Sequence, residues 1–297
     1  MPMMNRVIQK VLPVLTVIFA IIALWYGASV YMNAPFEHDR AERVGKIITF
    51  AEIIPKTMAQ ERPVLPAPHQ VVQEIWNTTV EKKITSKRSL IYHGWITLSA
   101  TLLGFIFGVL LGVSLAVGIV HSRVLDKSLM PWIITSQTIP ILAIAPMIIV
   151  VLNSVGFSGL LPKAFISTYL SFFPVAVGMV KGLRSPDHMH VDLMKTYNAD
   201  LRSVFWKLRL PASIPYLFTS MKIAIAASLV GAIVGELPTG AVAGLGARLL
   251  AGSYYGQTVQ IWSALFVAAF MAALLLMVIG IVSNVVNRRM GVRSLHS

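Results

Sequence analysis

Six apolar runs dominate this sequence, and each approaches the roughly 20 residues that an α-helix needs to cross a bilayer. Hydrophobic residues make up 56% of the 297, charged residues only 12%, and the mean hydropathy is +0.73. A chain of this composition buries its apolar surface in lipid rather than in one water-soluble core. The sequence therefore predicts an all-α integral membrane protein with about six transmembrane helices, near residues 11–32, 98–120, 131–152, 164–180, 214–237 and 261–286.

The distribution of basic residues predicts the orientation of these helices. The first run is long and no clear small-x-small cleavage site follows it, so we expect a membrane anchor rather than a signal peptide. With both termini in the cytoplasm, the short inner segments hold 13 basic residues, whereas the short outer loops hold only Lys163 and Arg248. The long loop 33–90 is then extracytoplasmic. It carries nine basic and seven acidic residues, but long loops translocate largely regardless of charge.

Several function classes find no support in the residues. The net charge of +13 could indicate nucleic acid, but the basic residues lie in loops between apolar runs and form no stripe. The absence of cysteine excludes disulfides, zinc–thiolate sites and thiol nucleophiles. The sequence has no His-Glu-x-x-His, no Gly-x-Ser-x-Gly and no Walker phosphate loop. We therefore expect no enzyme, no metal site and no ATP bound through such a loop on this chain.

Small and kinking residues interrupt the apolar runs. Gly104, Gly108 and Gly112 recur every four residues and would let another backbone approach, either within one subunit or between subunits. Broken or kinked helices are expected at Gln137, Thr138 and the prolines at 140, 146 and 174. Such helices either line a transport pathway or are merely kinked where they pack against other helices.

Two charged residues belong to the fifth apolar run. Glu236 is the only acidic residue in or beside an apolar run, where an ionisable group indicates function unless it is hydrated at the helix end. Lys222 lies nearer the inner end of the same run, and a lysine there can extend to the cytoplasm, so we assign it no role.

The segment between Lys181 and Arg209 is basic and amphipathic. Its apolar residues follow helical spacing, and Asn198 lies midway, where asparagine tolerates the left-handed conformation that ends a helix. The pattern predicts two short helices joined by a turn, the second ending near Pro211. An exposed apolar face on such a loop requires a partner, either the membrane interface or another protein.

This segment resembles the coupling loop of binding-protein-dependent ABC importer permeases, whose pattern is Glu-Ala-Ala, three residues, Gly, nine residues, Ile-x-Leu-Pro. The full spacing is kept, with departures at the two alanines, and the matching positions are Asp192, Leu193, Met194, Asn198, Leu208, Leu210 and Pro211. Segments 65–75, 137–146 and 234–236 are similar to the nitrate/sulfonate/taurine branch, while residues 33–60 look like an insertion. The resemblance covers roughly residues 63–290.

The resemblance implies a type I ABC importer permease in the bacterial inner membrane. Its expected parts are an anchor at 1–32, an extracytoplasmic loop with an interfacial segment at 33–90, a permease core at 91–290 and a cytoplasmic tail at 291–297. In such importers two permease subunits, identical or paralogous, form a dimer around the pathway. Two ATP-binding cassette ATPase subunits, which carry ATP and magnesium, dock on the coupling loop at 182–212, and an extracytoplasmic binding protein delivers the small solute.

The resemblance also assigns roles to residues of this chain. Leu193, Met194, Tyr197 and Phe205 become the docking face, Asp192 and Asn198 shape the helix ends, and Gln137, Thr138 and Glu236 line the pathway. The alternative is a non-transporting membrane anchor or assembly protein whose basic loop binds anionic lipid. Salt distinguishes the two, because a lipid-bound loop is released as ionic strength rises and an apolar docking face is not. An intramembrane enzyme is a third interpretation, but the apolar runs offer no paired acid, base or nucleophile.

Overall fold

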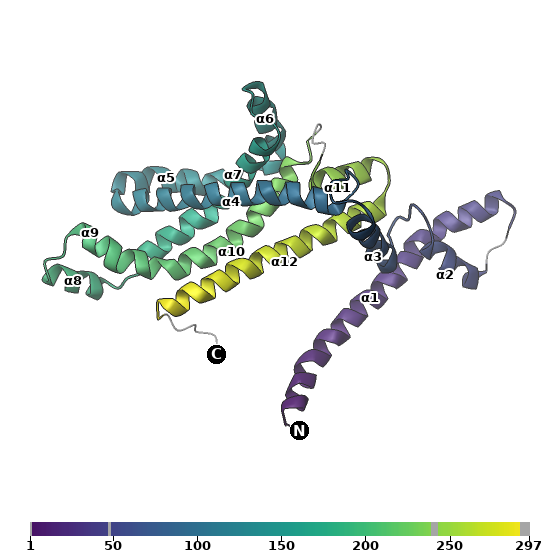
Figure 1. The fold of residues 1–297 in the computed structure, drawn as a ribbon, viewed down its shortest axis with the longest axis horizontal. Helices are drawn as coiled ribbons and strands as arrows, with labels where there is room; N and C mark the ends of the chain where they lie inside the picture. Colours follow the sequence, from purple (N-terminus) through teal and green to yellow (C-terminus); the bar gives the residue numbers. More distant parts are fainter. Residues whose placement is uncertain (1, 47–48, 239–242, 292–297) are drawn as a thin grey trace. The chain divides into compact units, whose positions relative to one another are not determined.

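The computed structural model describes residues 2–46, 49–238 and 243–291, and every regular element within these ranges is a helix (Figure 1). The all-α prediction is therefore confirmed. The chain divides into two compact units, the first made of Met1–Ile91 with Arg248–Val267 and the second of Tyr92–Ala247 with Ala268–Ser297. The predicted tail beyond residue 291 lies outside the described residues.

The first unit holds a helix much longer than the apolar run that predicted it. It contains α1 (Pro2–Arg43), α2 (Phe50–Met58), α3 (Pro68–Trp76), the π-helical turn η1 (Asn77–Glu81), most of α11 (Leu245–Tyr254) and the start of α12 (Thr258–Arg289). At 1.5 Å per residue, α1 is about 63 Å long, roughly twice the hydrocarbon thickness. Its polar second part continues as helix because α2 packs beside it and Gln60 donates to the buried Glu37 at 2.7 Å.

Side chains of α1 hold the segment that precedes α3. The indole of Trp25 donates to the carbonyl of Pro66 at 3.0 Å and stacks on Phe266 of α12. The fully buried Asn33 donates to the carbonyl of Leu65 at 2.8 Å and accepts the amide of Val64 at 2.7 Å. These contacts pair three backbone groups of the segment with side chains of α1.

The second unit is built on three closely packed helices, α4 (Leu90–His121), α7 (Leu160–Leu183) and α10 (Leu210–Gly235). A Cβ added to Gly104 would lie 2.2 Å from Cβ of Ser167, and one added to Gly108 would lie 2.0 Å from Oγ of Ser171. The glycines of α4, including Gly112, therefore face α7 of the same chain, which is the first of the two alternatives. Hydroxyl groups link the same helices, with Ser167 donating to Ser228 and Ser228 to Thr101.

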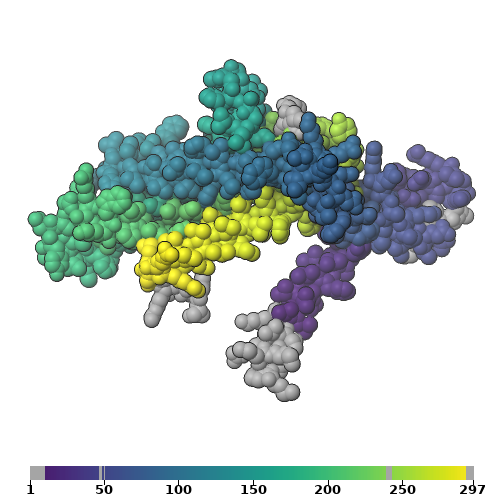
Figure 2. Space-filling model, in the orientation of Figure 1, coloured from purple at the N-terminus to yellow at the C-terminus, as the bar shows by residue number. Residues whose placement is uncertain are grey.

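The predicted third span is not one straight helix. Residues 131–152 fall on α5 (Arg123–Ser136) and α6 (Ile141–Ser154), which are bent by 102° at the break before Pro140. Proline lacks the amide that would continue the helix, so the break falls at this proline. Pro174 lies instead inside the continuous α7. Figure 2 shows α6, in teal, projecting from the surface of the unit.

Length and composition agree with a protein that crosses a membrane several times. Within the described ranges five helices are long and apolar enough to span it, or six if α5 and α6 form one broken span. The remaining elements, α8 (His188–Thr196), α9 (Leu201–Val204) and the π-helical turn η2 (Phe205–Arg209), connect α7 to α10.

Candidate functional site

The connection between α7 and α10 is a helical hairpin that projects from the ends of these two helices (Figure 1). Asp187 caps α8 by accepting the amide of Met189, and Asp200 caps α9 by accepting the amide of Ser203 at 3.0 Å. The hydrogen bonds from Ser203 lower the pKa of the Asp200 carboxyl. Asn198 ends the first helix with φ of +52°, the only non-glycine positive φ in the described part of the chain. The predicted helix–turn–helix is confirmed, with Asn198 at the turn.

Two details of the prediction are wrong. The second helix does not end near Pro211, because η2 leads directly into α10 and Pro211 lies in its first turn, where proline costs no hydrogen bond. Asp192 does not shape a helix end either. It lies within α8 and pairs with Lys195 at 2.9 Å, while Asp187, five residues earlier, is the cap.

The hairpin exposes an apolar surface, hereafter the hairpin face: Met189, Leu193, Tyr197 and Leu201. Tyr197 is 79% exposed and Leu201 86% exposed, and Met189, Leu193 and Tyr197 are four residues apart, which places them on one side of the chain. Met194 is half-buried beside this face. Met189 and Leu201 were missed from the sequence as members of the face, although the four-residue spacing contained the signal.

Phe205 points away from the hairpin face and into the unit. Its ring lies 5.0 Å from that of His121, edge to face, and it packs against the buried cluster that contains Met179 and Leu183. Leu210 packs against the same cluster, and Leu208 and Pro211 are half-buried. These residues attach the hairpin to the helical core rather than extending its exposed surface.

Glu236 lies at the centre of a buried polar cluster, hereafter the Glu236 cluster: His93, Thr97, Lys163, Glu236 and the amides of residues 244–246. The carboxylate is fully buried, accepts the Thr97 hydroxyl at 2.9 Å and the Gly246 amide at 2.9 Å, and lies 3.6 Å from Nζ of Lys163. Lys163 also donates to the carbonyl of Ala243 at 2.9 Å. The cluster joins α4, α7 and α10 to the start of α11.

The segment that enters α11 is fitted closely around this carboxylate. Thr97 accepts the amide of Leu245, and His93 accepts that of Gly244, both at 2.9 Å. Gly244 has φ of +132°, and a Cβ there would lie 2.1 Å from the Glu236 carboxyl carbon. The geometry indicates that Glu236 holds the backbone of the segment that enters α11. Its role in lining a pathway stays a prediction. Sequence reasoning missed Thr97, Lys163 and His93, which lie far from Glu236 along the chain.

A groove of about 810 Å³ runs along α7 and α10. Its polar lining consists of Gln137, Lys181, Tyr216, Thr219 and Ser220, and its apolar lining includes Phe173, Pro174 and Ile223. Gln137, predicted for the pathway, lies on this groove. Thr138 is outside the lining and donates to the carbonyl of Thr135 at 2.8 Å.

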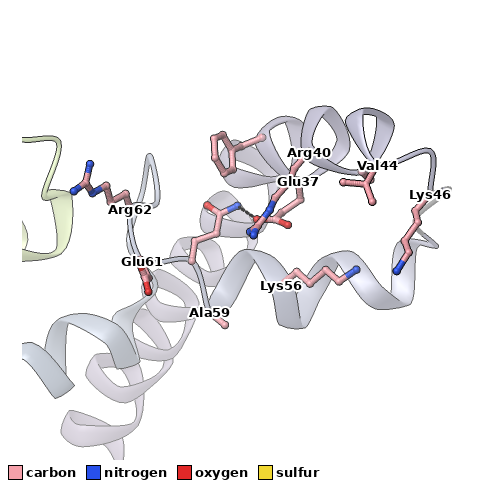
Figure 3. A pocket seen from close by; sticks show the side chains of 11 residues that line it. Glu37, Arg40, Val44, Lys46, Lys56, Ala59, Glu61 and Arg62 are labelled. Atoms are coloured by element: carbon pink, nitrogen blue, oxygen red, sulfur yellow. Dashed lines mark hydrogen bonds between the residues drawn. The ribbon is translucent and has the colours of Figure 1, made fainter.

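A second cavity, of about 790 Å³, lies in the first unit between the end of α1 and the segment around α2 (Figure 3). Arg40, Lys46, Lys56 and Arg62 line it together with Glu37 and Glu61. Its lining residues belong to 33–60 and the segment just after. That residues 33–60 are an insertion relative to the family stays a prediction.

A polar contact also fixes α3 in the first unit. Glu74 of α3 lies 4.0 Å from Arg248 of α11, and both side chains are largely buried. Burial raises the pKa of the Glu74 carboxyl and lowers that of Arg248.

The comparisons identify the family. Residues 108–292, more than half of the chain, match the family described as "Binding-protein-dependent transport system inner membrane component". The chain belongs to this family. The match includes the hairpin between α7 and α10, the groove and most of the Glu236 cluster.

Individual relatives agree with this assignment. The chain is 28% identical over 224 residues to a "Probable ABC transporter permease protein" of Haemophilus influenzae, covering 75% of this chain and 86% of the relative. It is 31% identical to the formylaminopyrimidine transport permease of Halalkalibacterium halodurans, over 61% of this chain and 68% of the relative. It is 24% identical to the nitrate import permease of Leptolyngbya laminosa, over 73% and 77%. The chain is therefore an ABC importer permease of the predicted branch and a multi-pass membrane protein.

Proposed function

We propose that this chain forms the transmembrane pathway of an ABC importer and that ATP hydrolysis on partner subunits drives transport through it. The solute is small and is delivered by an extracytoplasmic binding protein, and both termini of the chain are cytoplasmic. The observation that carries this proposal is the hairpin between α7 and α10, which exposes large apolar side chains on a segment rich in polar and basic residues. An exposed face of this kind fits the groove of a partner protein.

The hairpin is suited to transmit motion. Its two helices are capped by Asp187 and Asp200, and Phe205 and Leu210 attach it to the buried cluster between α4, α5 and α7. A pull on the hairpin face would therefore reach the spanning helices without being absorbed by a flexible linker. Closure of two ATPase subunits would draw together the hairpins of two permease copies, or of this chain and a paralogue, and rock the helices between inward- and outward-facing states.

Replacing Leu193 by glutamate tests the docking proposal. The substitution places a charge in the centre of the hairpin face, which an apolar groove on the ATPase would have to desolvate. We expect the affinity for the ATPase to fall by at least about 30-fold, which corresponds to the loss of a strong interface contact of about 2 kcal/mol. The measurement is co-purification and titration of the ATPase with permease in detergent or nanodiscs.

Lys195→Glu is the matched control, because Lys195 lies on the other side of α8 and is exposed. It changes the charge of the hairpin by two units without touching the hairpin face, so ATPase affinity should change little. The lipid-binding alternative makes the opposite prediction, since loss of a basic residue would weaken attachment to anionic vesicles and salt would weaken it further. Full ATPase recovery with Leu193→Glu would refute the docking proposal.

A further inference from the structure

The hairpin is continuous along the chain with α7 and α10, but not with the broken span formed by α5 and α6. At the base of the hairpin α7 and α10 are packed closely, because a Cβ added to Gly182 of α7 would lie 3.0 Å from Cα of Ser213 in α10. A displacement of the hairpin face would therefore move α7 and α10 together. The broken span follows this motion only if side chains connect it to these helices.

Polar contacts at both ends of α5 attach it to α7. In the first turn of α5 the carboxylate of Asp126 lies 2.8 Å from a guanidinium nitrogen of Arg184, which caps the C-terminus of α7. In the last turn the carbonyl of Ser136 accepts the hydroxyl of Tyr169 in α7. Between these contacts, Ile133 of α5 belongs to the buried cluster that attaches the hairpin.

The ion pair between Asp126 and Arg184 lies at the base of the hairpin. Arg184 follows the fully buried Leu183 and precedes Asp187, the cap of α8, by three residues. Its side chain is 46% exposed and that of Asp126 is 34% exposed, so the pair adds little to stability. Its contribution is geometric, because a charge-assisted hydrogen bond fixes the base of the hairpin relative to the start of α5.

A displacement at the start of α5 would reach the groove through the helix itself. At 1.5 Å per residue, the 14 residues of α5 form an arm about 21 Å long. Gln137 caps the far end of this arm and lines the groove along α7 and α10, and the 102° break before Pro140 follows. The arm therefore connects the base of the hairpin to the groove.

We propose that Asp126 and Arg184 are positioning residues that transmit motion of the hairpin to α5, and so to the broken span and the groove. The proposal rests on the transport function proposed above. It adds the residues through which ATPase docking acts on a helix that the hairpin does not continue into.

The absence of cysteine permits single thiols as reporters in the full-length permease with its ATPase in proteoliposomes. Gln137→Cys reports on the end of α5 and Thr219→Cys reports on α10, since both residues line the groove. The rate of each thiol with uncharged methyl methanethiosulfonate is measured without nucleotide and with ATP and vanadate. We expect nucleotide to change both rates, because closure of the ATPase subunits moves both helices.

Arg184→Asp and Asp126→Arg each replace the attraction by repulsion. The nucleotide-dependent ratio of rates at position 137 should move toward one by about three- to fivefold, the factor that corresponds to loss of a partly exposed ion pair. The ratio at position 219 should be kept, because α10 is continuous with the hairpin. Exchanging the two charges in one variant should restore most of the response at position 137, although each charge then lies at the less favourable helix end.

Lys195→Glu is the matched control, because it reverses one charge of an ion pair within α8 that joins no second helix. It should leave both ratios unchanged. ATPase affinity, titrated on the same samples, should be the same in all these variants, which separates loss of transmission from loss of docking.

An unchanged ratio at position 137 in both single variants would overturn the proposal. An exchange variant that responds no better than the single variants would also overturn it, because the ion pair would then not be the link. An equal loss at positions 137 and 219 would do the same, since the whole hairpin would have been disturbed. Without any nucleotide response at either position in the unmodified background, the proposed function itself would fail, and this proposal with it.

Discussion

The Glu236 cluster and the hairpin face both depart from the usual distribution of side chains. The cluster buries charged groups, whereas the hairpin face exposes apolar ones. The cluster buries a carboxylate and an ammonium within a chain that is 56% hydrophobic, and the hairpin exposes Leu193, Tyr197 and Leu201 on a polar connection. In the cluster each charge has partners from the same chain. On the hairpin the apolar groups are exposed, and the docking proposal supplies their partner from another molecule.

The contrast separates two kinds of contribution. Substitutions in the Glu236 cluster should reduce stability and leave the chemistry of the hairpin face unchanged. Substitutions on the hairpin face should reduce ATPase binding and leave the stability of the helical core unchanged. The following variants are designed to break this separation, beginning with the largest expected effect.

Glu236→Ala should be the most damaging of these variants. It leaves the Gly246 amide without its acceptor and removes the carboxylate that pairs with Lys163 and accepts the Thr97 hydroxyl. Loss of one partner from a buried charged pair typically costs about 3–5 kcal/mol. We expect a lower apparent melting temperature of the purified permease and a lower yield in membranes. The fraction that folds should bind ATPase with normal affinity.

Glu236→Gln is the control for shape. The amide keeps an acceptor oxygen for Thr97 or Gly246 but gives up the ion pair with Lys163, so its loss of stability should be smaller than that of alanine. Equal melting temperatures for the alanine variant and the unmodified protein would show that the cluster does not hold α10 and the start of α11 together.

Gly104→Ala should have the next largest effect, because it forces α4 away from α7. The new methyl group would lie 2.2 Å from Cβ of Ser167 and 2.7 Å from the carbonyl oxygen of Ala164, and the latter belongs to the backbone and cannot rotate away. Overpacking of this kind costs about 1–3 kcal/mol. Thermal denaturation of the purified permease measures it.

Gly280→Ala provides the matched comparison on α12, where a Cβ meets no atom within 4 Å. It should be neutral or stabilise the helix by about 0.5–1 kcal/mol. If the two alanine variants had the same melting temperature, close packing of α4 on α7 would not explain the glycines at 104, 108 and 112.

How much the sequence predicts depends on whether a contact is local. The turn at Asn198 was predicted because one residue type and the spacing around it determine the conformation. The Glu236 cluster was not predicted, because Thr97 precedes Glu236 by 139 residues and no periodicity relates the two. The resemblance placed Phe205 on the docking face, but its ring faces His121 of α4, a contact that depends on the packing of distant helices.

The same distinction explains the errors at the ends of elements. Polar residues 33–43 predict the end of the first span, yet α1 continues to Arg43 because α2 packs against it. Pro211 predicts the end of a helix when only its neighbours are considered. It begins one instead, because η2 precedes it in helical conformation and the first turn of α10 requires no amide from it.

The smallest expected effect on the core, and a direct test of the hairpin, comes from Asn198. Valine at this position must adopt φ near +52°, which is unfavourable for a β-branched residue and costs about 1–2 kcal/mol. The hairpin would avoid this strain by changing the angle between α8 and α9, which displaces Tyr197 from Leu201 on the hairpin face. ATPase affinity should therefore fall by up to about tenfold, since 1.4 kcal/mol corresponds to a factor of ten. Asn198→Gly, which tolerates the same φ, should bind normally, and the melting temperature of the core should be the same in both variants. Normal ATPase binding by the valine variant would mean that the docking partner does not require the two helices of the hairpin to be held in this arrangement.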